Sequence, residues 1–223
     1  MSEAQLPTQG DDVASGTHTP GTQASAAEPA VAAEPAVAAE LAGLAQASAQ
    51  QLAAVAQGYT ARPMTAQDLG AVHELELTLF PEDAWPLRMF QDELAHPEWR
   101  RYWLIEDGAG LVGYAGAQYS PHLADVQTIG VAPGHEGKGL GTFLLLLMAE
   151  RAKAWGATDL MLEVRSDNPR AQQLYLRHGF ETIHTRKRYY QDGTDALIMR
   201  LSLAGFASPS TQNPQSTTQG ESA

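Results

Sequence analysis

Three glycines at alternating positions, Gly137, Gly139 and Gly141, give this sequence its clearest site for a charged ligand. They follow a short apolar segment that ends in a Pro-Gly turn, and they lead into the apolar run 143–148. This order predicts a strand, a loop and a long helix. The first turn of a helix carries amides without intrahelical partners and a partial positive charge, and glycines let a ligand approach the main chain closely. The loop therefore predicts an anion site that suits phosphate.

Two common phosphate-binding loops do not fit the spacing. A Walker A loop requires a glycine five residues before the Gly-Lys pair and Ser or Thr after it, but Ala132 and Gly139 stand at those places. A dinucleotide-binding loop requires a third glycine where this sequence has Thr142. A glycine cluster alone is equally compatible with an ordinary turn, so this loop identifies a function only together with other motifs.

Hydrophobic periodicity and turn residues predict the elements that would position the loop. Strands are expected at residues 59–62, 101–106, 111–119, 123–131, 159–165, 180–190 and 196–203. Helices are expected at residues 69–80, 87–94, 168–178 and from the glycine loop to about residue 155. This order predicts an α/β fold in which a mixed central sheet of about seven strands has helices on both faces.

Composition divides the chain into three parts. Residues 1–57 consist mainly of Ala, Gln, Ser, Thr, Glu and Pro, repeat the hexamer Ala-Glu-Pro-Ala-Val-Ala, and contain no aromatic residue. Such a segment buries too little apolar surface to offset the entropy of ordering, so a disordered leader is expected, with a transient helix at 40–57 as an alternative. Residues 58–203 are expected to form one folded domain, and residues 204–223 a disordered polar tail.

Charge and residue usage exclude several classes of function. The net charge is −12, and neither Lys nor Arg precedes Arg62. A main function in nucleic-acid binding is not expected, because phosphate contacts require a basic surface. The chain has no cysteine, and its 7 histidines form no pair at metal-ligand spacing, so we expect no metal. No apolar run has the length of a membrane helix and no signal peptide is evident, which predicts no membrane partner and a cytoplasmic protein.

Four motifs, in order, resemble the catalytic half of the GNAT acyltransferases. They are Glu136-Gly-Lys-Gly-Leu-Gly141, the strand Leu162-Glu-Val-Arg165, Asn168 followed seven residues later by Tyr175, and Gly179-Phe180. Segments 186–190 and 195–199, together with the pairs Phe80-Pro81 and Trp85-Pro86, are similar to those of the RimI-type protein N-terminal acetyltransferases. That group acetylates the terminal alanine of a small-subunit ribosomal protein. The resemblance covers residues 59–203.

The resemblance implies acetyl-CoA as the donor, with its pantetheine arm between the strands at 123–131 and 159–165. It implies Glu163 as the general base, Tyr175 as the general acid, and Trp85 and Tyr189 in the segments that face the acceptor. The implied cofactor-binding residues are Ile129, Gly130 and Val131 for the arm, Glu136, Gly137, Lys138, Gly139, Leu140 and Gly141 for the pyrophosphate, and Asn168. Glu136 departs from the Gln or Arg usual in the family and places a negative charge beside the pyrophosphate.

Elementary chemistry supports these residue types. An amine attacks a thioester only when it is neutral, and an α-amino group with a pKa of about 7.7–8.0 loses its proton far more readily than a lysine at about 10.4. A partly buried carboxylate such as Glu163, which has apolar neighbours on its strand, can accept that proton. A phenol such as Tyr175 can stabilise the departing thiolate. Each residue could instead be structural, Glu163 as a surface residue of a strand and Tyr175 as a core residue of a helix.

Three hypotheses follow for the function. The first is a protein N-terminal acetyltransferase that acts on a terminal alanine, with a ribosomal protein as the partner. The second is an acetyltransferase of the same fold that acts on small amines or on lysine side chains. The third is a CoA-binding regulator without turnover, and the presence of both Glu163 and Tyr175 argues against it.

Overall fold

The computed structural model describes residues 2–5, 58–204 and 206. Its strands are β1 (Ser2–Gln5), β2 (Thr60–Pro63), β3 (Arg100–Asp107), β4 (Gly110–Ser120), β5 (Leu123–Val131), β6 (Asp159–Arg165), β7 (Glu181–Arg186) and β8 (Ala196–Ser202). Its helices are the short 3₁₀ helix η1 (Ala66–Asp68), α2 (Leu69–Leu79), α3 (Leu87–Leu94), α4 (Leu140–Ala154) and α5 (Pro169–Arg177). None of the described helices is long and apolar enough to cross a membrane.

The helix boundaries follow from individual residues. The backbone N–H of Thr65 donates to the Asp68 carboxylate at 2.8 Å, which closes a capping box at the start of the first helical segment. The Arg62 guanidinium bonds the same carboxylate at 2.6 Å and lowers the pKa of Asp68 to about 2. Pro86 precedes the first turn of α3, where a missing N–H costs no helical hydrogen bond.

The eight strands of the described residues all belong to one mixed sheet. Seven of them lie in the order β2-β3-β4-β5-β6-β8-β7, and β1 pairs with β5 beside that path. The pair β5–β6 is parallel, and the other neighbours are antiparallel. The expectation of a mixed sheet of about seven strands is therefore confirmed, and β1 is an additional strand that the sequence did not predict.

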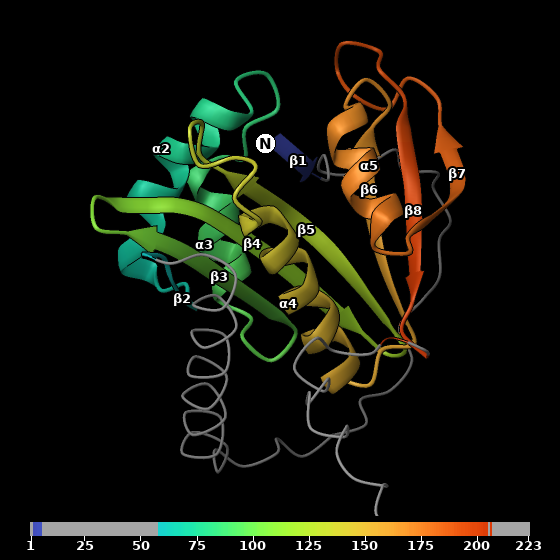
Figure 1. Cartoon of the computed structure of the whole chain (residues 1–223), viewed down its shortest axis with the longest axis horizontal. Helices are drawn as coiled ribbons and strands as arrows, with labels where there is room; N and C mark the ends of the chain where they lie inside the picture. Colours follow the sequence, from blue (N-terminus) through green and yellow to red (C-terminus); the bar gives the residue numbers. More distant parts are fainter. Residues whose placement is uncertain (1, 6–57, 205, 207–223) are drawn as a thin grey trace, which may run out of the picture.

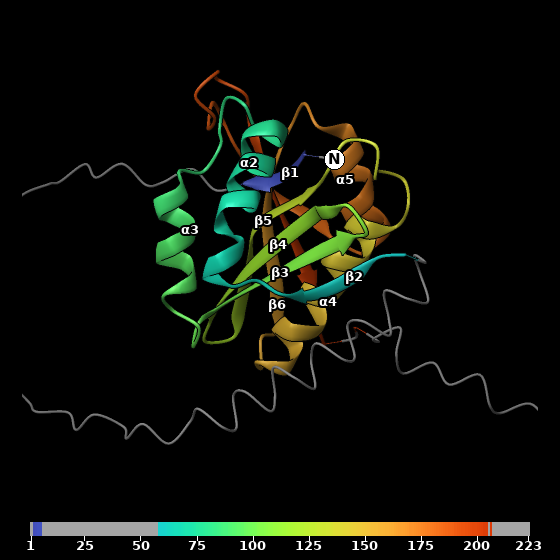
Figure 2. The ribbon, with the colours of Figure 1, turned by 90° about the vertical axis from the view of Figure 1, so that its left-hand side faces the viewer.

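Helices cover both faces of the sheet. Figure 2 shows α2 and α3 on one side of the strands and α4 and α5 on the other. On the α4 side the larger hydrophobic cluster gathers α4 and α5 residues such as Leu144, Met148 and Tyr175 against the strands. On the other side a smaller cluster joins Val72, Phe90 and Tyr114. The expectation of helices on both faces is confirmed.

The strands β5 and β6 separate soon after they begin. They are paired only from Leu123 to Asp125 on β5, opposite Asp159 to Met161 on β6. Beyond this point β1 lies along the free edge of β5, with Ser2 opposite Gly130, Glu3 opposite Ile129 and Gln5 opposite Thr128. Figure 1 draws β1 between β5 and α5. The gap, by which we mean the separation of β5 and β6 beyond Asp125 and Met161, lies where the family resemblance implies the pantetheine arm.

Gly130 lets β5 pack directly against α2. A Cβ atom at this position would lie 2.5 Å from Leu79 Cδ1 and 3.1 Å from Tyr114 Cε1. Tyr114 in turn donates its hydroxyl to the fully buried carboxylate of Glu76, which also accepts the backbone N–H of Trp85 at 2.9 Å. The segment that follows α2 is thus anchored to the sheet next to the gap.

Two expectations from the sequence differ from the structure. Ser2–Gln5 forms a strand although the leader was expected to be disordered, because the free edge of β5 offers main-chain partners that composition does not reveal. The strand expected at 180–190 ends at Arg186, since Arg188 adopts a left-handed φ of 52°. The expectations for residues 6–57, including the helix at 40–57, and for almost all of the tail lie outside the described residues.

Candidate active site

The glycine loop connects the end of β5 to the start of α4. Gly137 and Gly139 have φ values of 72° and 83°, a region that favours glycine, and Gly139 is the N-cap of α4. No side chain caps this helix. The amides of its first turn therefore face the loop in the arrangement that binds an anionic oxygen.

Basic groups surround the loop and balance Glu136. Arg170 Nη1, in the first turn of α5, lies 2.6 Å from Glu136 Oε2. Lys138 Nζ donates to the Tyr59 hydroxyl at 3.0 Å, and the same hydroxyl lies 3.0 Å from Nδ1 of His135. The negative charge of Glu136, which the sequence places beside the expected pyrophosphate, is thus paired with a cation from α5. Tyr59, His135 and Arg170 are residues of this region to which the sequence alone assigned no role.

Glu163 lies on β6 at the point where β5 has moved away. It is 7% exposed, and its Oε1 accepts a hydrogen bond from Arg186 Nη1 at 2.6 Å. Its Oε2 is buried and has no hydrogen-bond partner among the described residues. The carboxylate is therefore inside the protein but in contact with a half-exposed cation from β7. This position suits a group that exchanges a proton with a ligand in the gap.

Two tyrosines adjoin this carboxylate. The Tyr189 hydroxyl accepts a hydrogen bond from Arg186 Nη1 at 3.2 Å, and the Tyr189 ring packs edge-on against Tyr190 at 5.4 Å between centroids. Burial, followed by hydrogen bonding to Glu163 and by the charge of that carboxylate, raises the pKa of Tyr189 to about 12. Burial and the charge of Glu163 raise the pKa of Tyr190 further. Both phenols therefore remain protonated at neutral pH.

Asp125 is a second carboxylate near Glu163. It lies on β5 opposite Met161, two residues before Glu163 in the parallel register. Burial, followed by the charge of Glu163, raises the pKa of Asp125 to about 6. The sequence gave no reason to select this residue, because an aspartate in a strand is ordinarily exposed; only the register of β5 against β6 relates it to Glu163.

Tyr175 and Asn168 both belong to α5. The Tyr175 ring is fully buried in the larger hydrophobic cluster and lies 5.7 Å from Phe180. Asn168 is the N-cap of the helix, and its Oδ1 accepts the backbone N–H of Ala171 at 3.1 Å. The oxygen of Asn168 is thus used to start α5, which orients the helix that carries Tyr175.

Trp85 lies in the segment between α2 and α3. It is 4% exposed and its ring packs against Phe90 at 5.4 Å between centroids. The indole Nε1 is buried and has no hydrogen-bond partner among the described residues. This burial favours a role in shaping the segment, with more exposed neighbours left to contact an acceptor.

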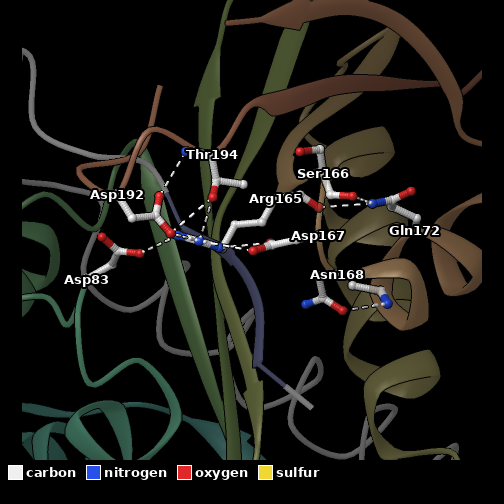
Figure 3. A network of polar contacts seen from close by, with 9 residues as sticks. Asp83, Arg165, Ser166, Asp167, Asn168, Gln172, Asp192 and Thr194 are labelled. Atoms are coloured by element: carbon white, nitrogen blue, oxygen red, sulfur yellow. Dashed lines mark hydrogen bonds and ion pairs between the residues drawn. The ribbon is translucent and has the colours of Figure 1, made fainter. Parts of the chain in front are cut away.

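Arg165 connects three parts of the chain at the end of β6, as Figure 3 shows. Its Nη1 bonds Asp83 Oδ2 at 2.9 Å, in the segment between α2 and α3. Its Nη2 bonds Asp192 and lies 3.1 Å from the Thr194 hydroxyl, in the loop between β7 and β8. Its guanidinium also lies 4.6 Å from the centroid of the Tyr190 ring. One side chain therefore ties both segments that border the gap to the strand of Glu163.

The described residues contain no group of three or more His, Cys, Asp or Glu side chains that could hold a metal ion.

Comparison with known proteins agrees with this geometry. Residues 69–180 match the family described as acetyltransferase (GNAT) family. An N-alpha-acetyltransferase RimI from Mycobacterium tuberculosis is 40% identical in an alignment of length 143 that covers 61% of this chain and 88% of the relative. A putative [ribosomal protein bS18]-alanine N-acetyltransferase from Bacillus subtilis is 35% identical over 143 residues, 64% of this chain and 94% of the relative.

A solved structure extends the comparison to the fold. The crystal structure of the ribosomal-protein-S18-alanine N-acetyltransferase from Escherichia coli superposes with a TM-score of 0.59 at 26% sequence identity. The similarity covers 68% of this chain and 97% of that protein.

Proposed function

This chain belongs to the GNAT acetyltransferase family and is an acetyl-CoA-dependent N-acetyltransferase, and from that premise we propose that it acetylates the α-amino group of a protein. The proposed acceptor is the N-terminal alanine of a ribosomal protein. One relative is named an N-alpha-acetyltransferase and another a putative [ribosomal protein bS18]-alanine N-acetyltransferase, and they match the present chain over 88% and 94% of their own lengths. Because the similarity spans nearly whole relatives, it includes the acceptor side of the domain as well as the donor side.

The observation that carries the proposal is the buried carboxylate of Glu163 at the opening between β5 and β6. In this proposal Glu163 takes a proton from the acceptor ammonium, directly or through water, which leaves a neutral amine to attack the thioester. An ammonium ion has the same charge as the guanidinium of Arg186, so it can replace Arg186 at Oε1, which now accepts a 2.6 Å hydrogen bond. Tyr175 donates a proton or a strong hydrogen bond to the departing thiolate.

We propose that the donor lies along the free edge of β5 and across the glycine loop. Main-chain groups of Ile129, Gly130 and Val131 hold the pantetheine arm, and residues 136–141 hold the pyrophosphate. The pairing of Glu136 with Arg170 at 2.6 Å supports this placement, because it removes the repulsion that an isolated carboxylate would exert on the pyrophosphate. Asn168 adjoins the same region through the start of α5.

The proposed general base, Glu163, favours one type of acceptor amine over another. An α-amino group has a reference pKa of about 7.7–8.0 and a lysine side chain about 10.4, so deprotonating the lysine near pH 7.5 costs roughly 3 kcal/mol more. A single carboxylate that is shared with an arginine is a modest base. It therefore suits the α-amino group better than the lysine.

A panel of acceptors tests the proposal. The purified protein is mixed with acetyl-CoA and with a peptide that begins with a free alanine, the same peptide with its α-amino group blocked, a blocked peptide with one internal lysine, and spermidine. Free thiol release and the mass of the peptide are measured. We expect turnover on the free alanine peptide and at least tenfold less on the others. Preference for lysine or spermidine would support the second hypothesis, and CoA binding without any turnover would support a regulator.

A further inference from the structure

The strand β1 lies on the same edge of β5 that the proposed donor would use. Ser2, Glu3 and Gln5 are the Cα partners of Gly130, Ile129 and Thr128 in an antiparallel pair. We propose that β1 is a competitor of acetyl-CoA: it covers the pantetheine edge of β5 when the donor site is empty and leaves when the donor binds. This inference rests on the donor placement in the proposed function and adds a regulation of that site.

The edge of β5 needs a partner because β6 does not supply one there. The last pair between β5 and β6 is Asp125 with Met161, and residues 128–130 are buried. Main-chain N–H and C=O groups that are buried without partners are costly, so such an edge favours any extended chain that can pair with it. In the described part of the protein, β1 is the chain that pairs with this edge.

A pantetheine arm and a strand satisfy the same groups. The arm contains two amides and is extended, so it can bond to a strand edge as a peptide does. Paired strands lie about 4.8 Å apart, which leaves room for one partner on one edge. Because β1 pairs with two of the three residues proposed to hold the arm, Ile129 and Gly130, the two occupants exclude each other.

The direction of β1 argues against its being an acceptor in this position. β5 runs toward the glycine loop, and the antiparallel β1 starts opposite Gly130 and runs away from the loop to Thr128. A donor whose pyrophosphate lies on the loop runs in the same direction, with its thioester at the far end. The start of β1 therefore lies on the pyrophosphate side, and its pose fits a substitute for the donor rather than an amine waiting for the acetyl group.

The strength of the pairing is suited to displacement. β1 has four residues and a register shift between Glu3 and Gln5, so it makes few ladder hydrogen bonds. The entropy of ordering these residues offsets much of that gain. If closed and open forms differ in population by a factor of a few, the apparent dissociation constant of the donor rises by about that factor. We therefore expect an effect of about twofold to tenfold.

Deletion of the strand tests the proposal. The full chain is compared with a variant that lacks Ser2–Gln5 and with a matched control that lacks four residues at 22–25. Calorimetry measures the dissociation constant of CoA, and initial rates measure KM for acetyl-CoA and kcat at saturating acceptor. We expect the Ser2–Gln5 deletion to lower both donor constants about twofold to tenfold with kcat unchanged. The control deletion should leave all three values as in the full chain.

A fluorophore on β1 provides a structural test beside the binding and rate measurements. Because the chain has no cysteine, a Ser2→Cys variant accepts a single environment-sensitive fluorophore. We expect added CoA to change its emission with the same dissociation constant that calorimetry gives. Equal or weaker CoA binding by the deletion variant would overturn the proposal while leaving acetylation of the alanine peptide intact. Failure of both chains to bind CoA would overturn the donor placement itself.

Discussion

Arg165 Nη1 and Asp83 Oδ2 lie 2.9 Å apart although 82 residues separate them in the chain. This contact fixes the segment between α2 and α3 to the end of β6, and the same guanidinium bonds Asp192 and Thr194 in the loop between β7 and β8. The segment between α2 and α3 and the loop between β7 and β8 thus share one anchor. The anchor lies two residues beyond Glu163 on the same strand.

Replacement of Arg165 by methionine should affect the acceptor more than the donor. The change keeps an unbranched side chain but removes every bond to Asp83, Asp192 and Thr194, so both segments lose a fixed position. We expect KM for the alanine peptide to rise about tenfold, a loss of about 1.4 kcal/mol of binding, with KM for acetyl-CoA unchanged. Initial rates with each substrate varied in turn give both constants.

Arg200→Met on β8 is the matched control. Arg200 makes only a long ion pair, 3.8 Å from the half-buried Asp159, and it lies far along the sheet from these loops. A parallel rise of both Michaelis constants in Arg165→Met would indicate general destabilisation and would contradict the anchoring role.

Replacement of Glu163 by glutamine should lower kcat about 10²-fold to 10⁴-fold, because a neutral amide cannot accept the proton of the ammonium. The side chain keeps its size and can still meet Arg186, so CoA binding measured by calorimetry should be unchanged. Asp159→Asn removes the same charge from the same strand and should retain full activity. Unaltered kcat in Glu163→Gln would remove this residue from the proposed mechanism.

Asp125 should make stability depend on pH. Its folded pKa of about 6 lies above the ordinary value of 3.8. Below about pH 3 the carboxyl is almost fully protonated in both states, so it costs nothing. As the pH rises toward 6 the unfolded chain ionises first, which favours unfolding, and this loss of stability is complete above the folded pKa.

The Asp125→Asn variant should therefore unfold at a higher temperature than the parent at pH 8 and at nearly the same temperature at about pH 3. One pKa unit corresponds to about 1.4 kcal/mol. Allowing for solvent screening of a partly exposed side chain, we expect a gain of about 1–2 kcal/mol at pH 8. Thermal unfolding at both pH values measures it. Exposed Glu181, changed to glutamine, provides the reference, and an equal gain there would refute the argument.

Replacement of Gly137 by alanine should weaken CoA binding through the backbone. A Cβ at Gly137 meets no atom within 4 Å, so the cost comes from its φ of 72° rather than from a clash. A left-handed conformation costs a residue with a side chain about 1–2 kcal/mol, and relief of that strain distorts the loop. We expect CoA affinity to fall about tenfold in calorimetry.

Gly108→Ala is the comparison for this change, because a Cβ there also meets nothing within 4 Å and its φ is not in the left-handed region. It should bind CoA as the parent does. Equal affinity of both alanine variants would show that the loop does not hold the pyrophosphate through its conformation.

The sequence predicted those features that depend on neighbouring residues. The bounds of α3, β5 and β6 were predicted correctly, because prolines, glycines and alternating apolar residues mark them locally. The shortening of β7 was not predicted, since Asp195 bonds the Arg188 N–H at 2.9 Å and holds a turn that the apolar pattern does not encode.

In the candidate site, too, the sequence named the local motifs but not the distant residues that contact them. The glycine loop and Glu163 belong to contiguous motifs and could be named from the sequence. The partners of those motifs could not be named, because the contacts of Arg170 with Glu136 and of Arg186 with Glu163 join elements 34 and 23 residues apart. The pKa of Asp125 depends on the register between two parallel strands, which only the folded sheet defines.

The lack of a side chain at Gly130 affects how the proposed donor and acceptor would meet. A Cβ atom there would lie 2.5 Å from Leu79 Cδ1, so the absence of a side chain at Gly130 sets the distance between α2 and β5, the strand proposed to hold the donor. An added methyl group would collide with Leu79 and push it, together with the segment that follows it, away from β5. In the proposed mechanism, the alignment of amine and thioester therefore depends on the missing side chain of Gly130, and a larger residue at this position would misalign the reactants.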